Sequence, residues 1–481
     1  MVNPPAAEVA TGAAEVAAGK AEETAGEACG TTAAGDSAAG GPCAGQGEGA
    51  VAASEPAHAD GGAGGTPAAE GGALGEAGLV NRPAAEVATG KGEETAEEAC
   101  GTTAAGGSAA GGPCAGQGEG AVAASEPASG SCVTAGDARR AAAHWARSVG
   151  CHLPGVWGIY LSGSVVEAPD QQLWPPWSDV DLMLVTDGPG GELPREKFLH
   201  RGVLLEASPL PAQRLASPEA VLADYHLAQG LRRNTLLCDP DGRLAPLQRA
   251  VEAQFARRRW VRARMAQAME KSQRGLSGLD PASPFWAQVN GWAFSTGVMT
   301  HVLLVAALRN PTVRRRYHAV RELLLAAGRA PLHEALLEAL GSAYWTAAQA
   351  RGHLEALLET VDACGALMRT PLPWSADLTA SSRPILSQGL RADIEAGGHR
   401  EAAFWIVATA ARCQGVLAAD GSPADRARHG GPWRWLLEDL GIPDERALLQ
   451  RAALGRALLP RVLAAGEELL AENPAVWERE D

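Results

Sequence analysis

Hydrophobic and polar positions follow two different periodicities along this chain. Between residues 135 and 244, apolar runs alternate with Gly- and Pro-rich turns, which predicts short strands and two helices. The strands are expected within 155–164, 178–188, 200–210 and 232–242, and the helices at 135–150 and 217–230. After Leu244 the spacing of apolar residues is helical. The pattern therefore predicts an α+β protein, in which a small mixed sheet is followed by an all-helical part.

The first 130 residues follow neither pattern. They are mostly Ala, Gly, Glu, Thr and Pro, they lack Phe, Trp, Tyr and Ile, and a segment that starts at residue 19 recurs almost unchanged at residue 90. Such a stretch buries too little apolar surface to offset its conformational entropy. We therefore expect a disordered tail with a duplicated segment at 1–130, a mixed α/β domain at 135–244 and a helical domain at 245–481.

The tail also accounts for the charge of the protein. The whole chain has a net charge of −15, and the tail holds 18 of its acidic and 3 of its basic residues, so the other residues are neutral overall. The acidic balance therefore says nothing about the ligands of the folded part.

The nine cysteines show no metal-site or disulfide spacing. Four lie in the duplicated segments, and the others are scattered without a Cys-x-x-Cys pair. The N-terminal residues lack the basic start and apolar core of a signal peptide, and no apolar run approaches the roughly 18 residues that span a bilayer. We expect a reduced, cytoplasmic protein without a membrane association.

Two aspartates, one residue apart, open the second predicted strand. Side chains at i and i+2 of a strand point to the same side, so Asp179 and Asp181 are expected to project together while the apolar residues between and after them face the core. Two carboxylates so close repel each other unless a cation lies between them. Mg²⁺ prefers oxygen ligands of this kind, and the pair therefore indicates a metal site.

Glu206 and a Gly-Ser turn extend this pattern. Glu206 ends an apolar strand, and if that strand pairs beside the Asp-bearing one, the three acids form a cluster able to hold two metal ions. Gly163 follows the first strand and lets the backbone approach a phosphate, while Ser162 and Ser164 offer hydroxyl groups at a helix start. Each motif is common by itself, and only their order along the chain indicates a triphosphate site.

This order of motifs resembles the nucleotidyltransferase superfamily that includes the aminoglycoside nucleotidyltransferases and DNA polymerase beta. The residues that carry the resemblance are Gly163, Ser164, Asp179, Asp181 and Glu206. The resemblance implies that 135–244 is a catalytic domain whose three acids hold two Mg²⁺ ions. It further implies transfer of a nucleoside monophosphate, with AMP as the expected group, from an NTP to an acceptor with release of pyrophosphate.

The loop before the acid pair is longer than is usual in that family. Fourteen residues separate Ser164 from Asp179, and they include Trp174 and Trp177. These side chains either stack on a base or a sugar, or pack the loop against the fold. The unusual length of the loop leaves the identity of the acceptor undecided, but it does not change the prediction of the metal site.

Arginines and further acids add candidates without deciding the acceptor. Basic runs at 257–264 and 314–316 would suit RNA, but the neutral charge of the folded part favours a small molecule or a protein. Arg232 and Arg233 are equally plausible contacts for the triphosphate. The general base is left open between Glu206 and an acid of the helical domain such as Glu322.

Three hypotheses about function follow. The first is Mg²⁺-dependent nucleotidyl transfer to a hydroxyl or amine of a small molecule. The second is a protein-modifying, AMP-adding transferase of the toxin–antitoxin type, and the third is a catalytically silent nucleotide-binding module. The expected partners are an NTP and an unidentified small-molecule acceptor, nucleic acid is disfavoured, and a homodimer is an open possibility.

Overall fold

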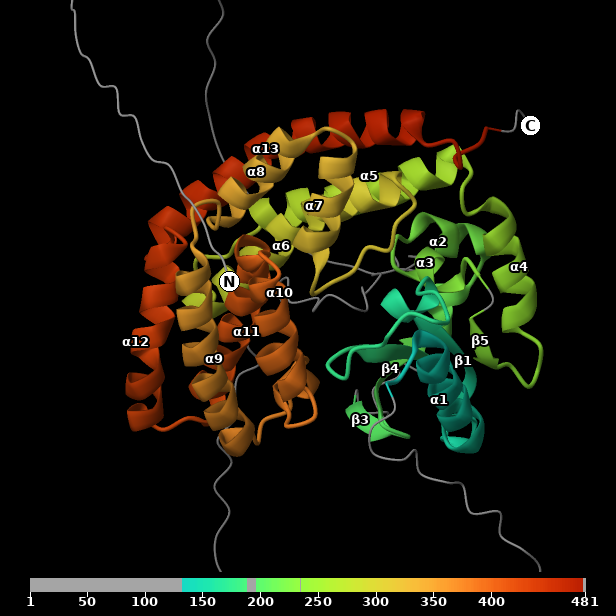
Figure 1. The fold of residues 1–481 in the computed structure, drawn as a ribbon, viewed down its shortest axis with the longest axis horizontal. Helices are drawn as coiled ribbons and strands as arrows, with labels where there is room; N and C mark the ends of the chain where they lie inside the picture. Colours follow the sequence, from blue (N-terminus) through green and yellow to red (C-terminus); the bar gives the residue numbers. More distant parts are fainter. Residues whose placement is uncertain (1–131, 188–195, 234, 479–481) are drawn as a thin grey trace, which may run out of the picture. The chain divides into compact units, whose positions relative to one another are not determined.

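The computed structural model describes residues 132–187, 196–233 and 235–478, so the predicted disordered tail at 1–130 lies outside the described residues. The described chain is α+β, with a small mixed sheet of five strands followed by a helical region (Figure 1). The fold class expected from the hydrophobic pattern is confirmed at this level. The division into two domains at residue 244 stays a prediction.

The sheet brings together strands that are far apart in the sequence. Its strands are β1 (Val156–Ser162), β2 (Asp179–Thr186), β3 (Glu196–His200), β4 (Val203–Pro211) and β5 (Leu236–Cys238). Their order across the sheet is β3-β4-β2-β1-β5, with β2 and β4 parallel and the other neighbours antiparallel. The strand that carries Glu206 therefore does pair beside the strand that carries the two aspartates.

β3 is a strand that the hydrophobic pattern does not predict. Its sequence, EKFLH, is short and lacks regular alternation, and charged residues are common in edge strands of this kind. It forms the edge of the sheet and pairs antiparallel with β4 through a connection at Arg201 and Gly202, whose φ angles are 52° and 76°. Positive φ at both central residues is typical of the tight hairpin turns that match the twist of antiparallel strands.

Helices cover both faces of this sheet. The helix α1 (Ala135–Ser148), which starts at a capping box between Thr134 and Asp137, packs on one face (Figure 1). Its apolar partners include the β2 side chains that alternate with the aspartates, namely Val180, Leu182 and Leu184. The opposite face packs against α2 (Pro218–Ala223), α3 (Leu227–Leu231) and α4 (Leu244–Gln254). The helix α4, which begins at residue 244, therefore packs in the core on this face of the sheet.

The helix predicted at 217–230 is two helices. Ser217 caps α2 as its sequence indicates, but the chain leaves the helical conformation at Asp224. The Asp224 carboxylate accepts hydrogen bonds from the backbone N–H groups of His226 and Leu227, each at 3.0 Å, and so starts α3. A short polar side chain that bonds its own backbone in this way favours a turn over a continuous helix.

The helical region surrounds two long apolar helices. Its helices are α5 (Arg258–Ser277), α6 (Phe285–Ala306), α7 (Arg316–Ala326), α8 (Ala330–Leu340), α9 (Ala347–Leu367), α10 (Arg391–Glu395), α11 (His399–Asp420), α12 (Pro423–Asp439) and α13 (Glu445–Glu472). Between α9 and α10 lie a short 3-10 helix, η4 (Ser375–Leu378), and a π-helix, η5 (Ile385–Leu390). The helix α6 packs against α5, α7, α8, α11 and α13, which explains why nearly all of its side chains are buried.

Two helices correct the expectation that no apolar run is long enough to span a bilayer. By length and composition, α6 and α11 each contain an 18-residue window that would suffice, with mean hydropathies of 1.2 and 1.4. Within the structure 94% and 83% of those windows are buried. Helices at the centre of a helical core are apolar all round for the same reason as membrane spans, so these two helices are weak evidence for a membrane.

A disulfide bond corrects the expectation drawn from the cysteine spacing. Cys151, just after α1, is bonded to Cys238 at the end of β5, and the two have a sequence separation of 87. The pair has no recognisable spacing because the sheet, and not a local motif, brings the two residues together. Among the described residues, Cys132, Cys364 and Cys413 are free thiols.

Candidate functional site

A row of four polar residues crosses the sheet at one level. Ser162 on β1 pairs with Asp181 on β2, Asp181 pairs with Glu206 on β4, and Glu206 pairs with Lys197 on β3. Residues that pair directly across neighbouring strands have side chains on the same face. Asp181 of the predicted acid pair and Glu206 are therefore side by side on one face of the sheet.

The row interrupts an otherwise apolar face. On the same face, Tyr160, Val185 and Leu210 are buried in the core against α2, α3 and α4. Asp179 lies two residues before Asp181 and adds a third carboxylate to this end of the face. Because the neighbouring positions are apolar, a cluster of charges here needs either a cation or hydrogen-bond donors to compensate for burial.

Gly163 determines how close the backbone comes to this cluster. It has φ 72° and ψ −158°, a conformation that is essentially restricted to glycine. A Cβ atom at this position would overlap Oδ2 of Asp181, so the aspartate lies directly against the turn. The turn continues into η2 (Ser164–Val166), a single 3-10 turn and not the longer helix start expected for anion binding. Any phosphate contact here therefore depends on the turn itself and on the Ser162 and Ser164 hydroxyls.

The side chain of Lys197 lies inside the acid cluster. Its Nζ is 2.5 Å from Oδ2 of Asp179 and 2.6 Å from Oε2 of Glu206, and only 5% of its side chain is exposed. A third carboxylate, that of Asp377 on η4, lies 3.5 Å away. An ammonium group therefore holds the position between the two carboxylates where the sequence predicts a metal ion.

This ammonium determines the charge state of the cluster. Burial lowers the pKa of Lys197, but attraction to Asp179, Glu206 and Asp377 outweighs burial and holds that pKa well above its usual value. Burial raises the pKa of Asp179, yet the nearby ammonium brings it below its ordinary value. The pKa of Glu206 is raised, because burial and repulsion from Asp179 and Asp377 outweigh the attraction to Lys197. One ammonium cannot neutralise the charge of three carboxylates. Lys197 therefore stabilises the charged form of Asp179 more than that of Glu206.

Arginines from the helical region surround the same cluster. Nη1 of Arg412 on α11 lies 2.8 Å from Oδ2 of Asp377 and holds that carboxylate toward the sheet. Arg314 pairs with Asp393 at 3.2 Å and also attracts the Asp179 carboxylate. The acids of the sheet are therefore balanced by cations from both β3 and the helical region, and this balance could not be inferred from the local sequence.

The donor set fits a hard divalent cation. Asp179, Asp181 and Glu206 supply only carboxylate oxygens from one face of the sheet, which is the ligand type that Mg²⁺ prefers. Among the residues that the structure describes, however, no group of three or more His, Cys, Asp or Glu is arranged to hold a metal. The Lys197 ammonium lies between the Asp179 and Glu206 carboxylates. An ion that bridges Asp179 and Glu206 would take the position of this ammonium.

The long loop before β2 packs against the fold. Trp174 is buried with the α1 side of the sheet, and its indole N–H donates to the carbonyl of Ser178 at 3.0 Å. Trp177 is half-buried beside the π-helix, where a Cβ on Gly389 would come within 2.9 Å of its ring. The packing interpretation therefore holds for Trp174, while Trp177 ties the loop to the helical region close to Asp179.

The basic runs are engaged in the fold. Arg264 is buried and donates to the carbonyl oxygens of Leu222 and Phe255, and Arg262 pairs with Glu467. These contacts give the first run a structural role.

Two other basic candidates are engaged as well. Arg314 and Arg315 both pair with Asp393, and Arg232 pairs at 2.6 Å with Glu167, just after the Gly-Ser turn. Arg232 therefore lies near the Gly-Ser turn, but its ion pair is with Glu167, and its predicted contact with a triphosphate stays a prediction.

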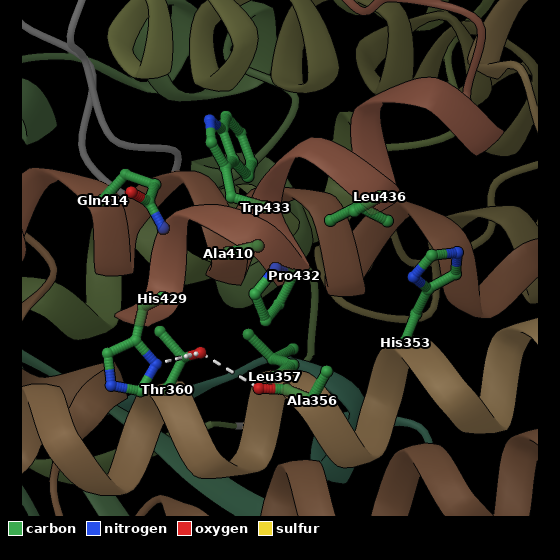
Figure 2. Close-up of a pocket in the computed structure, with 10 residues that line it drawn as sticks. All are labelled: His353, Ala356, Leu357, Thr360, Ala410, Gln414, His429, Pro432, Trp433 and Leu436. Atoms are coloured by element: carbon green, nitrogen blue, oxygen red, sulfur yellow. Dashed lines mark hydrogen bonds between the residues drawn. The ribbon is translucent and has the colours of Figure 1, made fainter. Parts of the chain in front are cut away.

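A cavity in the helical region is too small to compete as a nucleotide site. His353, Thr360, His429 and Trp433 are among the residues around it (Figure 2), and its volume is about 20 Å³. That is room for about one water molecule. His429 Nδ1 and the Thr360 hydroxyl share a hydrogen bond of 3.0 Å within it. Polar side chains gathered there are therefore explained by packing.

A second cavity is large enough for a ligand but lacks the chemistry for a triphosphate. It measures about 430 Å³ and lies at the Trp157 end of β1, the opposite end from Ser162. Its lining contains one charged residue, Arg243, which stacks on the Trp157 ring at 3.8 Å, and no acid. It offers no carboxylate to hold the metal that a triphosphate brings.

Two residues of the cluster were missed by inference from the sequence. Lys197 lies on an edge strand without a hydrophobic pattern, and Asp377 lies about 170 residues beyond Glu206 in a short irregular segment. The proposed base Glu322 is exposed on α7, whereas Asp377 is the acid of the helical region that reaches Lys197.

Comparison of the chain with protein-family models, with curated proteins and with solved structures finds no match.

Proposed function

We propose that this protein is a nucleotidyltransferase that transfers a nucleoside monophosphate, with AMP as the expected group, from an NTP to an acceptor and releases pyrophosphate. The observation that carries the proposal is the register of β2 and β4. It sets Asp181 directly beside Glu206, with Asp179 on the same face and Gly163 against Asp181. These are the residues of the resemblance, and the pairing between the strands is independent of the motif that suggested them.

Each residue of the site would have a role that follows from its position. Asp179, Asp181 and Glu206 would hold Mg²⁺. When bound, the ion supplies positive charge that neutralises the triphosphate and helps to activate the acceptor. Gly163 keeps the backbone of the turn directly against Asp181, so a phosphate held by the acids would lie next to this turn. In the transfer, an acceptor oxygen or nitrogen forms the bond to the α-phosphorus while the bond to the pyrophosphate oxygen breaks. The acceptor proton passes to a base, for which Glu206 and Asp377 are the candidates within the cluster.

A small molecule remains the acceptor favoured by the neutral charge of the folded part. The contacts of Arg262, Arg264, Arg314 and Arg315 within the fold are a further argument against a basic nucleic-acid surface on those runs. The two-domain arrangement, a catalytic domain at 135–244 and a helical domain at 245–481, belongs to the same proposal. In it, Asp377 and Arg314 of the helical part contribute to the site.

A catalytically silent nucleotide-binding module is the second candidate. The observation that favours it is the Lys197 ammonium between Asp179 and Glu206. A permanent internal cation at this position would keep the acids from holding a metal. Binding without turnover would be the result.

Labelled NTPs separate these functions. The full chain is incubated with each α-labelled NTP and Mg²⁺, alone and with a cell lysate, and the small-molecule and protein fractions are separated. Label in a small molecule supports the proposal in full, and label on protein supports the protein-modifying alternative. Asp181→Asn should abolish transfer, whereas Asp187→Asn should not, because Asp187 lies exposed just after the other end of β2. Equal transfer in both variants, or none by the unmodified chain with any NTP, overturns the proposal.

A further inference from the structure

We propose that Lys197 is an internal counter-cation that excludes a divalent metal ion from the acid cluster until a nucleoside triphosphate arrives with it. This inference rests on the proposed function, because it concerns the same site. It goes beyond that function by assigning a role to Lys197 and by making metal loading depend on the nucleotide.

The first argument is the position of the ammonium group. Nζ lies within 2.6 Å of carboxylate oxygens of both Asp179 and Glu206, so it occupies the space that a cation bridging those groups would use. An ammonium and a divalent ion cannot share this space, since both need direct contact with the same oxygens. The two cations therefore compete.

The second argument is how Lys197 is held. It pairs in register with Glu206 across the β3–β4 hairpin, and Asp377 approaches it at 3.5 Å from the helical region. With 5% of its side chain exposed, the ammonium has exchanged its hydration for these carboxylates. Its displacement without a new anionic partner would leave a poorly hydrated charge, which is strongly unfavourable.

The third argument is what could replace the lost partners. A divalent ion alone takes the carboxylates and adds positive charge, so it offers the displaced ammonium nothing. A triphosphate carries several negative charges and oxygen acceptors, and it lies next to the metal that it brings. When metal and nucleotide bind together, the metal pairs with the carboxylates and the displaced ammonium pairs with the triphosphate. When metal binds alone, the displaced ammonium has no anionic partner.

The test measures binding of Mn²⁺, which stands in for Mg²⁺ and is detected by its magnetic resonance signal. The full chain is titrated with Mn²⁺ alone and then with Mn²⁺ and an ATP analogue that cannot be cleaved at the α-phosphorus. Wild-type protein should bind Mn²⁺ at least about tenfold more tightly when the analogue is present. Lys197→Gln should bind Mn²⁺ alone at least about tenfold more tightly than the wild type does, because the competing charge is gone.

Three further variants give this result its meaning. Lys197→Arg keeps the charge and should keep the weak binding of Mn²⁺ alone. Arg201→Gln removes a positive charge from an exposed position of the same hairpin and should behave as wild type. Adding Asp181→Asn to Lys197→Gln should abolish the gained affinity, which places the bound ion at the acid cluster.

The outcomes also separate this inference from the proposed function. Unchanged or weaker Mn²⁺ binding in Lys197→Gln overturns the inference, even where nucleotidyl transfer is intact. Tighter Mn²⁺ binding in that variant supports the inference, even where no NTP is turned over and the transferase proposal fails. Tight binding of Mn²⁺ alone by the wild type also overturns it.

Discussion

Gly163 and Asp181 lie so close together that any side chain on Gly163 would overlap the Asp181 carboxylate. This relationship joins the two halves of the proposed site, the turn after β1 and the acid strand β2, which are separated by the long loop. It explains why the turn needs a glycine for two reasons, its positive φ and its lack of a side chain.

We expect Gly163→Ala to be more harmful than a substitution that introduces backbone strain alone. Gly202 is a control for positive φ, because its φ of 76° is close to the 72° of Gly163 but no atom lies within 4 Å of its Cβ position. Gly202→Ala should lower the free energy of unfolding by about 1 kcal/mol, whereas Gly163→Ala should add the displacement of Asp181 and lower it by about 2–3 kcal/mol. Urea denaturation measures both. Equal losses would show that the Asp181 carboxylate moves aside freely.

The two carboxylates that share Lys197 should respond oppositely when their charge is removed. The pKa of Asp179 is lowered in the fold, so the folded state favours its charged form, and Asp179→Asn should lower the melting temperature at pH 7. The pKa of Glu206 is raised, so the folded state favours its neutral form, and Glu206→Gln should leave the melting temperature unchanged or raise it. Thermal denaturation without added metal compares them. A large loss of stability in Glu206→Gln would contradict this assignment of charge.

Both of those variants should still lose nucleotidyl transfer. Glu206→Gln should slow single-turnover transfer on the order of 10²-fold or more if Glu206 also takes the acceptor proton, and should leave MgATP affinity nearly unchanged. Asp179→Asn should also weaken MgATP binding. Wild-type turnover by Glu206→Gln would mean that the pairing of β2 with β4 does not build the catalytic site.

The buried His318 should make stability depend on pH. Burial lowers the pKa of His318, and neither ring nitrogen has a hydrogen-bond partner among the described residues. Stability from the neutral ring is present above the ordinary histidine pKa, near 6.5, and is lost as the pH falls below it. The slope for one group is at most about 1.4 kcal/mol per pH unit.

His318→Leu tests this pH dependence because the variant cannot bind a proton there. Its unfolding free energy should fall less than that of the wild type between pH 7 and pH 5. The groups that face His318 are Asp393, Arg314, Arg315 and Glu401. If the two profiles are parallel, the pH dependence of the wild type arises from other groups.

The Cys151–Cys238 bond should stabilise the sheet. It ties the segment after α1 to β5 and closes a loop with a sequence separation of 87 residues. Its removal by Cys238→Ser should lower the free energy of unfolding by about 2–4 kcal/mol. A reducing agent should lower the melting temperature of the wild type and have no effect on the variant. Mass spectrometry after thiol alkylation shows directly whether the two cysteines are bonded, and free thiols at both positions would exclude the bond.

Local sequence determines much of the sheet. The strands β1, β2, β4 and β5 follow from short apolar runs that end at Gly, Pro and Asp, and the shared face of Asp179 and Asp181 follows from the two-residue period of a strand. The start of α1 follows from a capping box that is visible in four consecutive residues. These features need only contacts between residues close in sequence, which is why they could be predicted.

Tertiary structure decided the rest, because the remaining features depend on contacts between distant residues. The alignment of Glu206 with Asp181 required the register of two parallel strands, and the bond between Cys151 and Cys238 required the whole sheet. Lys197 reaches the acids from an edge strand whose pairing alone makes it a strand, and Asp377 reaches Lys197 from the helical region. The sequence by itself therefore indicates three acids of the cluster, Asp179, Asp181 and Glu206. Only the folded chain adds Asp377 and shows which cation lies between the carboxylates.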